Sequence, residues 1–468
     1  MIRLAAAVAV AALVAVPSFA QRGHADFTRF VALGDSYGAG VVSGSLNERH
    51  QVWSWPAVIA RQVGYSLCQP GAAATDDCFA QPLVTFPGLG PELQLINLAP
   101  TIAPAAGSGS PAMNTFGRRF NNLSIPGATV GALLTLTGGE TPTAGEPTAV
   151  SMARFILRGQ GTAVQQALAQ NPTFIAIWIG GNDALSAVFS GTPASMTSAT
   201  DFRARYDAML SALVAGAPNA GMVVGNIPVY PLPYMMLIPP VVINPATNQP
   251  VPGPNGQPIP LIAELGDGTV GPLPAGSYVL LHARANLQTG YGLPNVAPFN
   301  ALPNAGKPLA NGDVITPAEF ATISARVVDY NKTINELAAA RNIPVADINA
   351  LFGRMYATGG YKIGPITVTA APVTGGFFGL DFFHLTDLGY MLFANEYIRT
   401  INHAYDSEIP VAGIGQLFAN NGAFFPETTS GQMVLDASNL FVTDDSVAQI
   451  RSMWAQPTIK RMRRVGTH

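Results

Sequence analysis

The stretch FVALGDSYGAG, residues 30–40, decides how this chain is interpreted. Its apolar first half is typical of a buried β-strand, and the strand ends abruptly at Ser36, which glycines flank. Proteins present a reactive hydroxyl in this way, at the tip of a strand and beside the start of a helix. A serine hydroxyl is inert by itself, so a nucleophilic Ser36 requires a base, a group that orients the base, and donors for an oxyanion.

Apolar runs of the same kind recur along the chain, at 172–179, 222–227 and 343–348. They have no polar face, which is typical of strands buried in a parallel sheet. Helical patterns at about 201–215 and 316–341 alternate with them, and Glu319 follows Thr316 at the spacing of a capping box. We therefore predict an α/β fold, a three-layer α/β/α sandwich with a mainly parallel sheet.

Four further elements are expected. A short strand followed by a Pro-Gly turn is expected over about 118–129, and a helix over about 151–170. A final helix of the main domain is expected to reach about His403, and a further helical candidate lies at about 445–454.

Two segments rich in proline and glycine interrupt the pattern, at about 66–115 and 228–315. A structureless loop as long as the second is uncommon in a compact domain, so we expect it to pack as a small subdomain or lid. Its apolar cluster, 235–242, is expected to pack on the main core rather than to face lipid. The predicted organisation is a main domain over 21–405 that carries both insertions, followed by a C-terminal extension over 406–468.

The first twenty residues have the parts of a secretory signal peptide. Arg3 supplies an early positive charge, a short apolar segment follows, and small residues precede a cleavage position near Ala20. A membrane anchor is the alternative, but the apolar run is shorter than the roughly 20 residues that span a bilayer, and Pro17 ends it. We expect a mature protein that is secreted or periplasmic.

Cys68 and Cys78 are the only cysteines. In an oxidising compartment such a pair most simply forms one disulfide that pins a loop. A metal site is the alternative, but two thiols without a neighbouring histidine make a poor ligand set, and no His/Asp/Glu cluster has metal-ligand spacing. We therefore expect the disulfide and no metal.

The charge of the chain is low, with a formal net charge of -3 and 11% charged residues. No basic patch of the kind that binds nucleic acid follows from this composition, and no nucleic-acid partner is expected. The sequence carries no signal for the oligomeric state.

The serine motif at 34–38 fits Gly-x-Ser-x-Gly, a pattern that alone is more often a turn than a nucleophile. An α/β-hydrolase places its nucleophile mid-chain, whereas this serine follows the first strand. Three further blocks follow in order: Asn122–Thr129, Gly180–Asp183 and Asp381–His384. Singly, the glycine, asparagine and histidine in these blocks are as readily explained by turns or packing.

The four blocks together resemble the GDSL or SGNH hydrolases, a family named after Ser, Gly, Asn and His in four separated blocks. The resemblance covers about half of the chain, over 27–62, 121–227 and 316–403. Leu385 departs from it, because many members have proline after the histidine. The resemblance implies a flavodoxin-like α/β/α fold and hydrolysis of carboxylic esters without a cofactor.

The resemblance also implies the site residues. Ser36 would be the nucleophile, His384 the base and Asp381 the group that orients it; the spacing of three residues lets one tight turn bring the carboxylate back to the ring. The oxyanion would be bound by the backbone N–H groups of Ser36 and Gly127 and by the amide of Asn182.

Other polar residues receive structural roles. Asp347 is a rival orienter at a strand end, but we expect it to serve its own loop. Asp35 and Asp183 are expected to cap helices or brace turns. The other histidines, His24, His50, His282, His403 and His468, have no motif around them.

We therefore expect a secreted serine hydrolase that cleaves carboxylic esters through an acyl-enzyme. Lipid acyl esters are the favoured substrates, and the large apolar insertion leaves room for transient contact with a membrane or lipid surface. Two alternatives stay open: an esterase that removes acyl groups from carbohydrate, and a non-catalytic surface binding protein on the same fold.

Overall fold

The computed structural model describes residues 21–22, 25–423 and 426–453. The predicted signal peptide, residues 1–20, lies outside these ranges. Within the described ranges, no helix is both long and apolar enough to cross a membrane.

The predicted buried strands form one parallel sheet. Its members are β3 (Phe30–Gly34), β8 (Phe174–Trp178), β9 (Gly221–Gly225) and β16 (Val345–Ala346). They lie in the order β16-β9-β8-β3, and each neighbouring pair is parallel. Every residue of β3 and β8 is buried, as expected of strands that are apolar on both faces.

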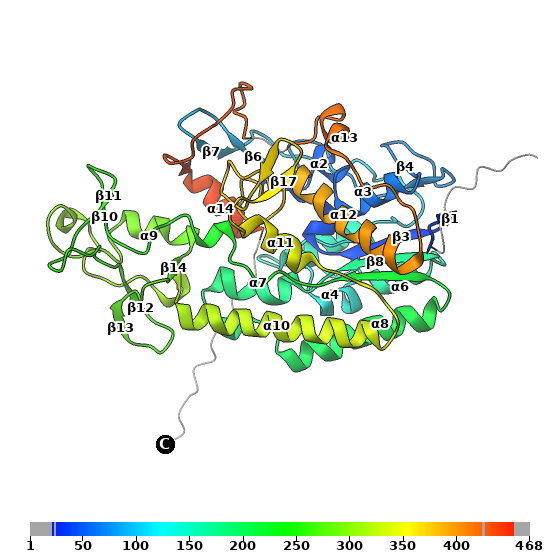
Figure 1. The fold of residues 1–468 in the computed structure, drawn as a ribbon, viewed down its shortest axis with the longest axis horizontal. Coiled ribbons are helices and arrows are strands. Elements are labelled where there is room, and N and C mark those ends of the chain that lie inside the picture. The colour runs from blue at the N-terminus through cyan, green and yellow to red at the C-terminus, as the bar shows by residue number, and fades with distance from the viewer. Residues whose placement is uncertain (1–20, 23–24, 424–425, 454–468) are drawn as a thin grey trace, which may run out of the picture.

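Helices cover both faces of this sheet (Figure 1). On one face α3 (Trp55–Gln62) packs against α12 (Asp387–Tyr405), and on the other α8 (Ala199–Gly216) packs against α10 (Pro317–Ala339). The predicted three-layer α/β fold with a mainly parallel sheet is confirmed. The capping box at the start of α10 is also present, since Glu319 N donates to Thr316 Oγ1.

The remaining elements are short. The helices are α1 (Ser36–Ala39), α2 (Glu48–Gln51), α4 (Val130–Thr135), α5 (Thr148–Leu157), α6 (Ala163–Leu168), α7 (Gly181–Ser190), α9 (Arg284–Gln288), α11 (Ile348–Tyr356), α13 (Ile414–Ala419) and α14 (Asp444–Ser452). The strands outside the main sheet are β1 (Gln21–Arg22), β2 (Ala25–Asp26), β4 (Ser66–Leu67), β5 (Cys78–Phe79), β6 (Leu93–Leu95), β7 (Thr101–Pro104), β10 (Ile243–Asn244), β11 (Gln249–Pro250), β12 (Ile262–Glu264), β13 (Val270–Pro272), β14 (Tyr278–Val279), β15 (Val314–Ile315), β17 (Tyr361–Ile363), β18 (Ile366–Val368) and β19 (Phe441–Val442).

Two predicted elements were wrong. The single helix over 151–170 is two helices, α5 and α6, because Arg158, Gly159 and Gly161 adopt positive φ angles between them. The strand expected over about 118–129 is reduced to one bridge between Asn122 and Ala32. The segment still lies along β3, since Leu123 N donates to Ala32 O at 2.9 Å and Ile125 N donates to Gly34 O at 2.9 Å.

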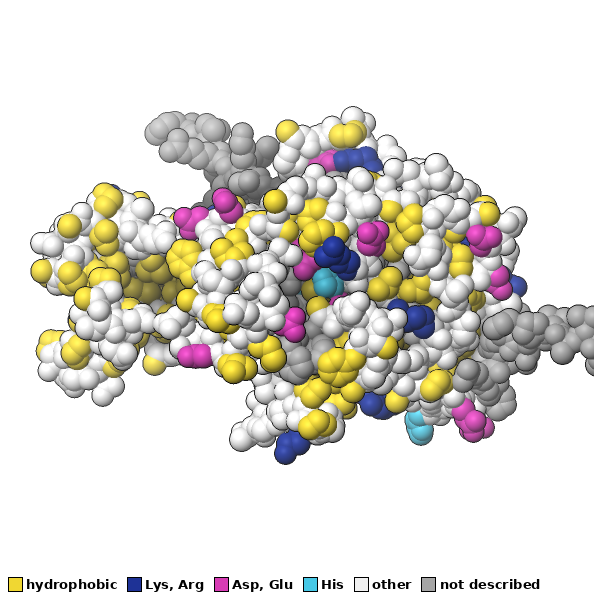
Figure 2. All heavy atoms as spheres, turned by 90° about the horizontal axis from the view of Figure 1, so that it is seen from above, with side chains coloured by type: hydrophobic (Ala, Val, Ile, Leu, Met, Phe, Trp, Pro, Cys, Tyr) yellow, Lys and Arg dark blue, Asp and Glu magenta, His cyan; other side chains and the backbone are white. Residues whose placement is uncertain are grey.

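The insertion at 228–315 forms a lobe beside the sheet, at the left of Figure 1. It has a small core of its own, made by Val242, Leu261, Ala263, Leu273, Val279, Ala283, Phe299, Leu309 and Val314. The apolar cluster expected to pack on the main core is divided: Met235 belongs to that core, Val242 belongs to the small one, and Met236 is 52% exposed. Figure 2 shows mainly hydrophobic and uncharged surface on this lobe from above.

The first insertion and the C-terminal extension meet in a second sheet. β6 pairs antiparallel with β7, and β19 pairs with β7 in parallel. The helix α14 packs on β7 (Figure 1). Within the first insertion, Cys68 and Cys78 form the predicted disulfide.

A buried ion network joins α2, the first insertion and the start of α12. His50 Nδ1 lies 2.9 Å from Asp387 Oδ1, and His50 Nε2 lies 3.3 Å from Glu92 Oε2. Burial alone would lower the pKa of His50, but the two carboxylates outweigh it and raise that pKa to about 10. This role of His50 could not be predicted from local sequence, because Glu92 and Asp387 both lie far from it in the chain.

Because of this network, we expect the folded protein to become less stable in mild alkali. The imidazolium is favoured in the folded state, so its contribution is complete below the ordinary histidine pKa of about 6.5 and is lost as the pH rises toward 10. We expect the unfolding free energy to fall over this range with a slope of up to about 1.4 kcal/mol per pH unit. Chemical denaturation between pH 6.5 and 10 measures it. His50→Gln should flatten the slope, and replacement of the exposed His403 by Gln should leave it; equal slopes in all three proteins would contradict the assignment.

Candidate active site

Ser36 is the first residue of α1, and Asp35 alone separates it from the end of β3, as the sequence predicts. The carboxylate of Asp35 caps this helix by accepting from Tyr37 N at 3.0 Å. Close packing requires the neighbouring glycines: a Cβ on Gly38 would lie 2.1 Å from Ser124 Oγ, and one on Gly34 would lie 2.8 Å from Trp178 O. The turn around Ser36 can therefore pack this closely because the positions two residues before and two residues after it carry no side chain.

Asp381 is fully buried and holds the imidazole of His384. Asp381 Oδ2 lies 2.7 Å from His384 Nδ1 and also accepts from Gly44 N at 2.6 Å. The other carboxylate oxygen, Oδ1, accepts from the backbone N–H groups of Phe383 and His384. Burial would raise the pKa of Asp381, but His384 and the N–H donors together hold it below its ordinary value. The carboxylate is therefore ionised beside the ring.

The backbone turn from Asp381 to His384 also determines where Nε2 lies, the ring nitrogen of His384 that is opposite to the one held by Asp381. Phe382 adopts a φ of 69°, a conformation that is rare for a residue other than glycine, and this curls the backbone around the carboxylate. Tyr37 Oη donates to Phe383 O at 2.5 Å, and the Tyr37 and His384 rings lie 5.8 Å apart. His384 Nε2 is buried and has no hydrogen-bond partner within the described part of the chain. The histidine loop is thus fastened to the residue that follows Ser36.

Asn182 lies in the first turn of α7, and its side chain is tied to the Gly127 loop. Asn182 Nδ2 donates to Ala128 O at 2.8 Å, and the next residue, Asp183, accepts from Val130 N at 3.0 Å. Gly127 has a φ of 80°, and a Cβ there would lie 3.1 Å from Ala149 N. Asn182 lines the same pocket as Ser36, whereas Gly127 lines a neighbouring hollow with Thr129 and Arg205. The structure therefore places Ser36 and Asn182 together and Gly127 beside them, outside the pocket wall.

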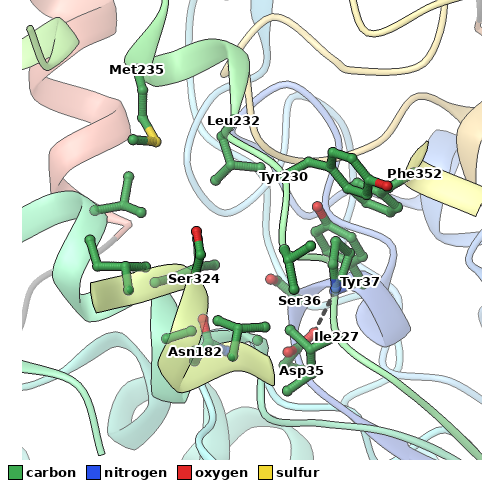
Figure 3. A pocket seen from close by; sticks show the side chains of 18 of the residues that line it. Asp35, Ser36, Tyr37, Asn182, Ile227, Tyr230, Leu232, Met235, Ser324 and Phe352 are labelled. Atoms are coloured by element: carbon green, nitrogen blue, oxygen red, sulfur yellow. Dashed lines mark hydrogen bonds between the residues drawn. The ribbon is translucent and has the colours of Figure 1, made fainter. Parts of the chain in front are cut away.

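The pocket at Ser36 is mainly apolar (Figure 3). The space between its walls, with the open solvent at its mouth, amounts to about 700 Å³, and the enclosed part is much smaller. Its apolar wall is formed by Trp178, Ala184, Leu185, Val188, Ile227, Pro228, Val229, Leu232, Met235, Phe320, Ile323, Val327 and Phe352, with the rings of Tyr37 and Tyr230. Ser36 and Asn182 lie at one side and Met235 at the other, with Ser324 of α10 between them (Figure 3). The lining therefore favours apolar over charged groups next to Ser36.

The residues expected to have structural roles have them. Asp347 caps α11 by accepting from Ala350 N, and it also accepts from Asn226 Nδ2. Asp183 braces the start of α7 as described, and Thr197 Oγ1 donates to it. In the described ranges, no group of three or more His, Cys, Asp or Glu side chains is placed to hold a metal ion.

Sequence reasoning missed two contributors to the site, Tyr37 and Gly44. Tyr37 stands inside the serine motif, but only the fold shows that its hydroxyl binds the histidine loop. Gly44 has a φ of 74° and donates its N–H to Asp381, which is 337 residues away. A glycine in a glycine-rich segment gives no signal of such a contact.

Ser36 thus begins the helix that follows the first strand of the parallel sheet, and the loop that carries the buried Asp381–His384 pair is hydrogen-bonded to Tyr37, the next residue. The chain belongs to the family described as GDSL-like Lipase/Acylhydrolase, whose sequence profile matches residues 30–397. It is accordingly a carboxylic ester hydrolase.

Three solved structures are similar over most of their length. An extracellular lipase from Streptomyces rimosus is 16% identical, with a TM-score of 0.33, over 80% of this chain and 98% of that one. A phospholipase A1 from Streptomyces albidoflavus NA297 is 15% identical, with a TM-score of 0.32, over 81% and 99%. A lipase/acylhydrolase from Enterococcus faecalis is 13% identical, with a TM-score of 0.31, over 82% and 100%. No curated protein sequence matches the chain, and the family assignment rests on the profile match.

Proposed function

We propose that this protein hydrolyses lipid acyl esters outside the cytoplasm, through an acyl-enzyme on Ser36. The observation that carries the proposal is the mainly apolar pocket that opens on Ser36. Besides Ser36, its lining includes the polar side chains of Asp35, Asn182 and Ser324 and two tyrosines. An acetylated sugar would leave this wall unfilled and would place its own hydroxyl groups against hydrocarbon, which costs free energy. A fatty acyl chain would bury its length there.

The proposed reaction begins with attack of Ser36 Oγ on the ester carbonyl. His384 Nε2, which has no hydrogen-bond partner in the described structure, takes the serine proton and then gives it to the departing alcohol. Asp381 keeps the Nδ1 proton on its own side of the ring and stabilises the imidazolium. Water, activated by the same histidine, then releases the carboxylic acid and restores Ser36.

The negative charge on the carbonyl oxygen would be met by the N–H groups of Ser36 and Gly127 and by Asn182 Nδ2. Ser36 N lies at the start of a helix, and Asn182 retains a second amide hydrogen beyond the one given to Ala128. Gly127 N would have to reach the same point from the adjoining hollow. Each donor of this kind contributes on the order of 3 kcal/mol to the transition state.

Work outside the cytoplasm is supported by the Cys68–Cys78 disulfide, because such bonds persist in oxidising compartments. Contact with a lipid surface is supported by Met236, which is 52% exposed and follows Met235 of the pocket wall directly. An apolar side chain at this place would meet the lipid from which the substrate is drawn.

The test uses p-nitrophenyl esters of increasing acyl length together with acetylated glycans. We expect kcat/KM to rise from acetate to octanoate, and we expect Ser324→Phe to lower the octanoate value by roughly tenfold while acetate hydrolysis changes little, since the ring fills the acyl space. The matched control is Ala325→Phe, at an exposed position of the same helix that does not line the pocket. Activity confined to acetylated glycans would refute the lipid assignment.

A further inference from the structure

We propose that Gln449, in the C-terminal helix α14, is a positioning residue for Asp381. This inference rests on the proposed roles of Asp381 and His384. Gln449 lies beyond residues 30–397, so the family profile assigns it nothing. Its side-chain amide donates to Gly44 O at 3.1 Å and also to Pro91 O.

Gly44 connects this amide to the carboxylate. Gly44 N donates to Asp381 Oδ2 at 2.6 Å, and the same oxygen lies 2.7 Å from His384 Nδ1. The chain of contacts therefore runs from the amide of Gln449 through one residue to the oxygen that holds the base. Among the hydrogen bonds to that carboxylate, this is the one whose donor lies outside the Asp381–His384 turn itself.

The turn that contains Gly44 needs support from outside. Ser43 and Gly44 both have positive φ angles, 48° and 74°, and Ser45 N closes the turn by donating to Val42 O. A serine in this conformation is strained, and a strained turn holds its shape only when its surroundings fix it. A second contact, from Leu380 N to Ser43 Oγ at 3.0 Å, binds the same turn to the residue before Asp381.

The helix that carries Gln449 is itself fixed. Ser446 Oγ donates to Ile102 O at 3.0 Å, Thr443 N donates to the same carbonyl at 3.1 Å, and Ile450 is fully buried. Gln449 lies three residues after Ser446, on the neighbouring part of the same side of α14, and is half-buried. Its amide is therefore delivered from a rigid element, as positioning of a reacting group requires.

The assignment predicts a loss in turnover rather than in substrate binding. Gln449→Met keeps the length and removes both donors, and we expect kcat per active site to fall roughly tenfold with KM changed less than twofold, because the base is displaced while the acyl pocket is untouched. Gln449→Lys keeps an N–H donor and should recover most of the rate. Active sites are counted by fluorophosphonate labelling, so loss of folded protein does not enter kcat.

Ser446→Ala is the matched control, since it loosens α14 from β7 without removing the donor to Gly44. A Gln449→Met protein with the kcat of the wild type would overturn the inference, and so would an equal loss of kcat in Ser446→Ala. Failure of the wild-type protein to be labelled would instead refute the proposed function. The two failures are distinguishable because Gln449→Met is expected to be labelled completely and to turn over slowly.

Discussion

Ser36→Ala is expected to abolish ester hydrolysis, with kcat falling by a factor on the order of 10⁴ or more and KM changing little. The hydroxyl is the proposed nucleophile, and a methyl group cannot form the acyl-enzyme. The fold should be unaffected, because Ser36 is a small helix-start residue and the cap of α1 is supplied by Asp35. Initial rates on an octanoate ester, together with labelling by a fluorophosphonate, measure the effect.

Ser324→Ala is the control for this substitution. Ser324 lines the same pocket but has no proposed part in bond breaking, so its replacement should leave both labelling and turnover within a few-fold of the wild type. Residual labelling of Ser36→Ala at the wild-type level would show that another residue is the nucleophile. It would also remove the non-catalytic alternative, since a binding protein would not be labelled at all.

Asp381→Asn is expected to lower kcat by on the order of 10⁴, the scale on which an acid-to-amide change costs a serine hydrolase its correct histidine tautomer. The reason lies in the hydrogen bonds. Oδ1 accepts from two backbone N–H groups, so the amide oxygen will take that place and the NH₂ group will face Gly44 N and His384 Nδ1. Nδ1 must then accept a hydrogen bond, which moves the ring proton to Nε2 and prevents that atom from taking the serine proton.

The comparison variant is Asp347→Asn, because Asp347 was the rival orienter in the sequence and caps α11 in the structure. It should cost stability through the weaker cap, by about 1 kcal/mol or less, and leave turnover unchanged. Steady-state rates and thermal unfolding of both proteins separate the two roles. A loss of turnover in Asp347→Asn that matched Asp381→Asn would contradict the assignment of the acid.

Much of the fold was predictable because local sequence and tertiary structure agree in the core. Strands apolar on both faces, such as 172–179, have no stable place except inside a parallel sheet. The start of α10 was predictable for the same reason, because its capping box is present both in the local sequence and in the structure. The errors lie where the structure departs from the local sequence pattern. Residues 121–125 hydrogen-bond to β3 without regular strand geometry. Arg158 leaves the helical conformation, and the chain turns there.

The candidate site residues could be located in the sequence, whereas the distant contacts that support them could not. Ser36, Asn182 and the Asp381–His384 pair stand in motifs because each needs a particular neighbour within a few residues. Gly44, His50 and Gln449 act through partners 337 to 405 residues away, and no local pattern encodes such a contact. The pocket wall was equally hidden, since its aliphatic residues are ordinary core residues until the sheet and the insertion bring them together.

The contact between Gln449 and Gly44 has a consequence for how the protein is made. It closes a span of 405 residues, and contacts of such separation form late, after the parts synthesised first have folded. Ser36, Asp381 and His384 all leave the ribosome before α14 does. If Gln449 holds the acid in place, a chain whose α14 has not yet docked still works slowly, and full activity appears only when α14 has packed on β7.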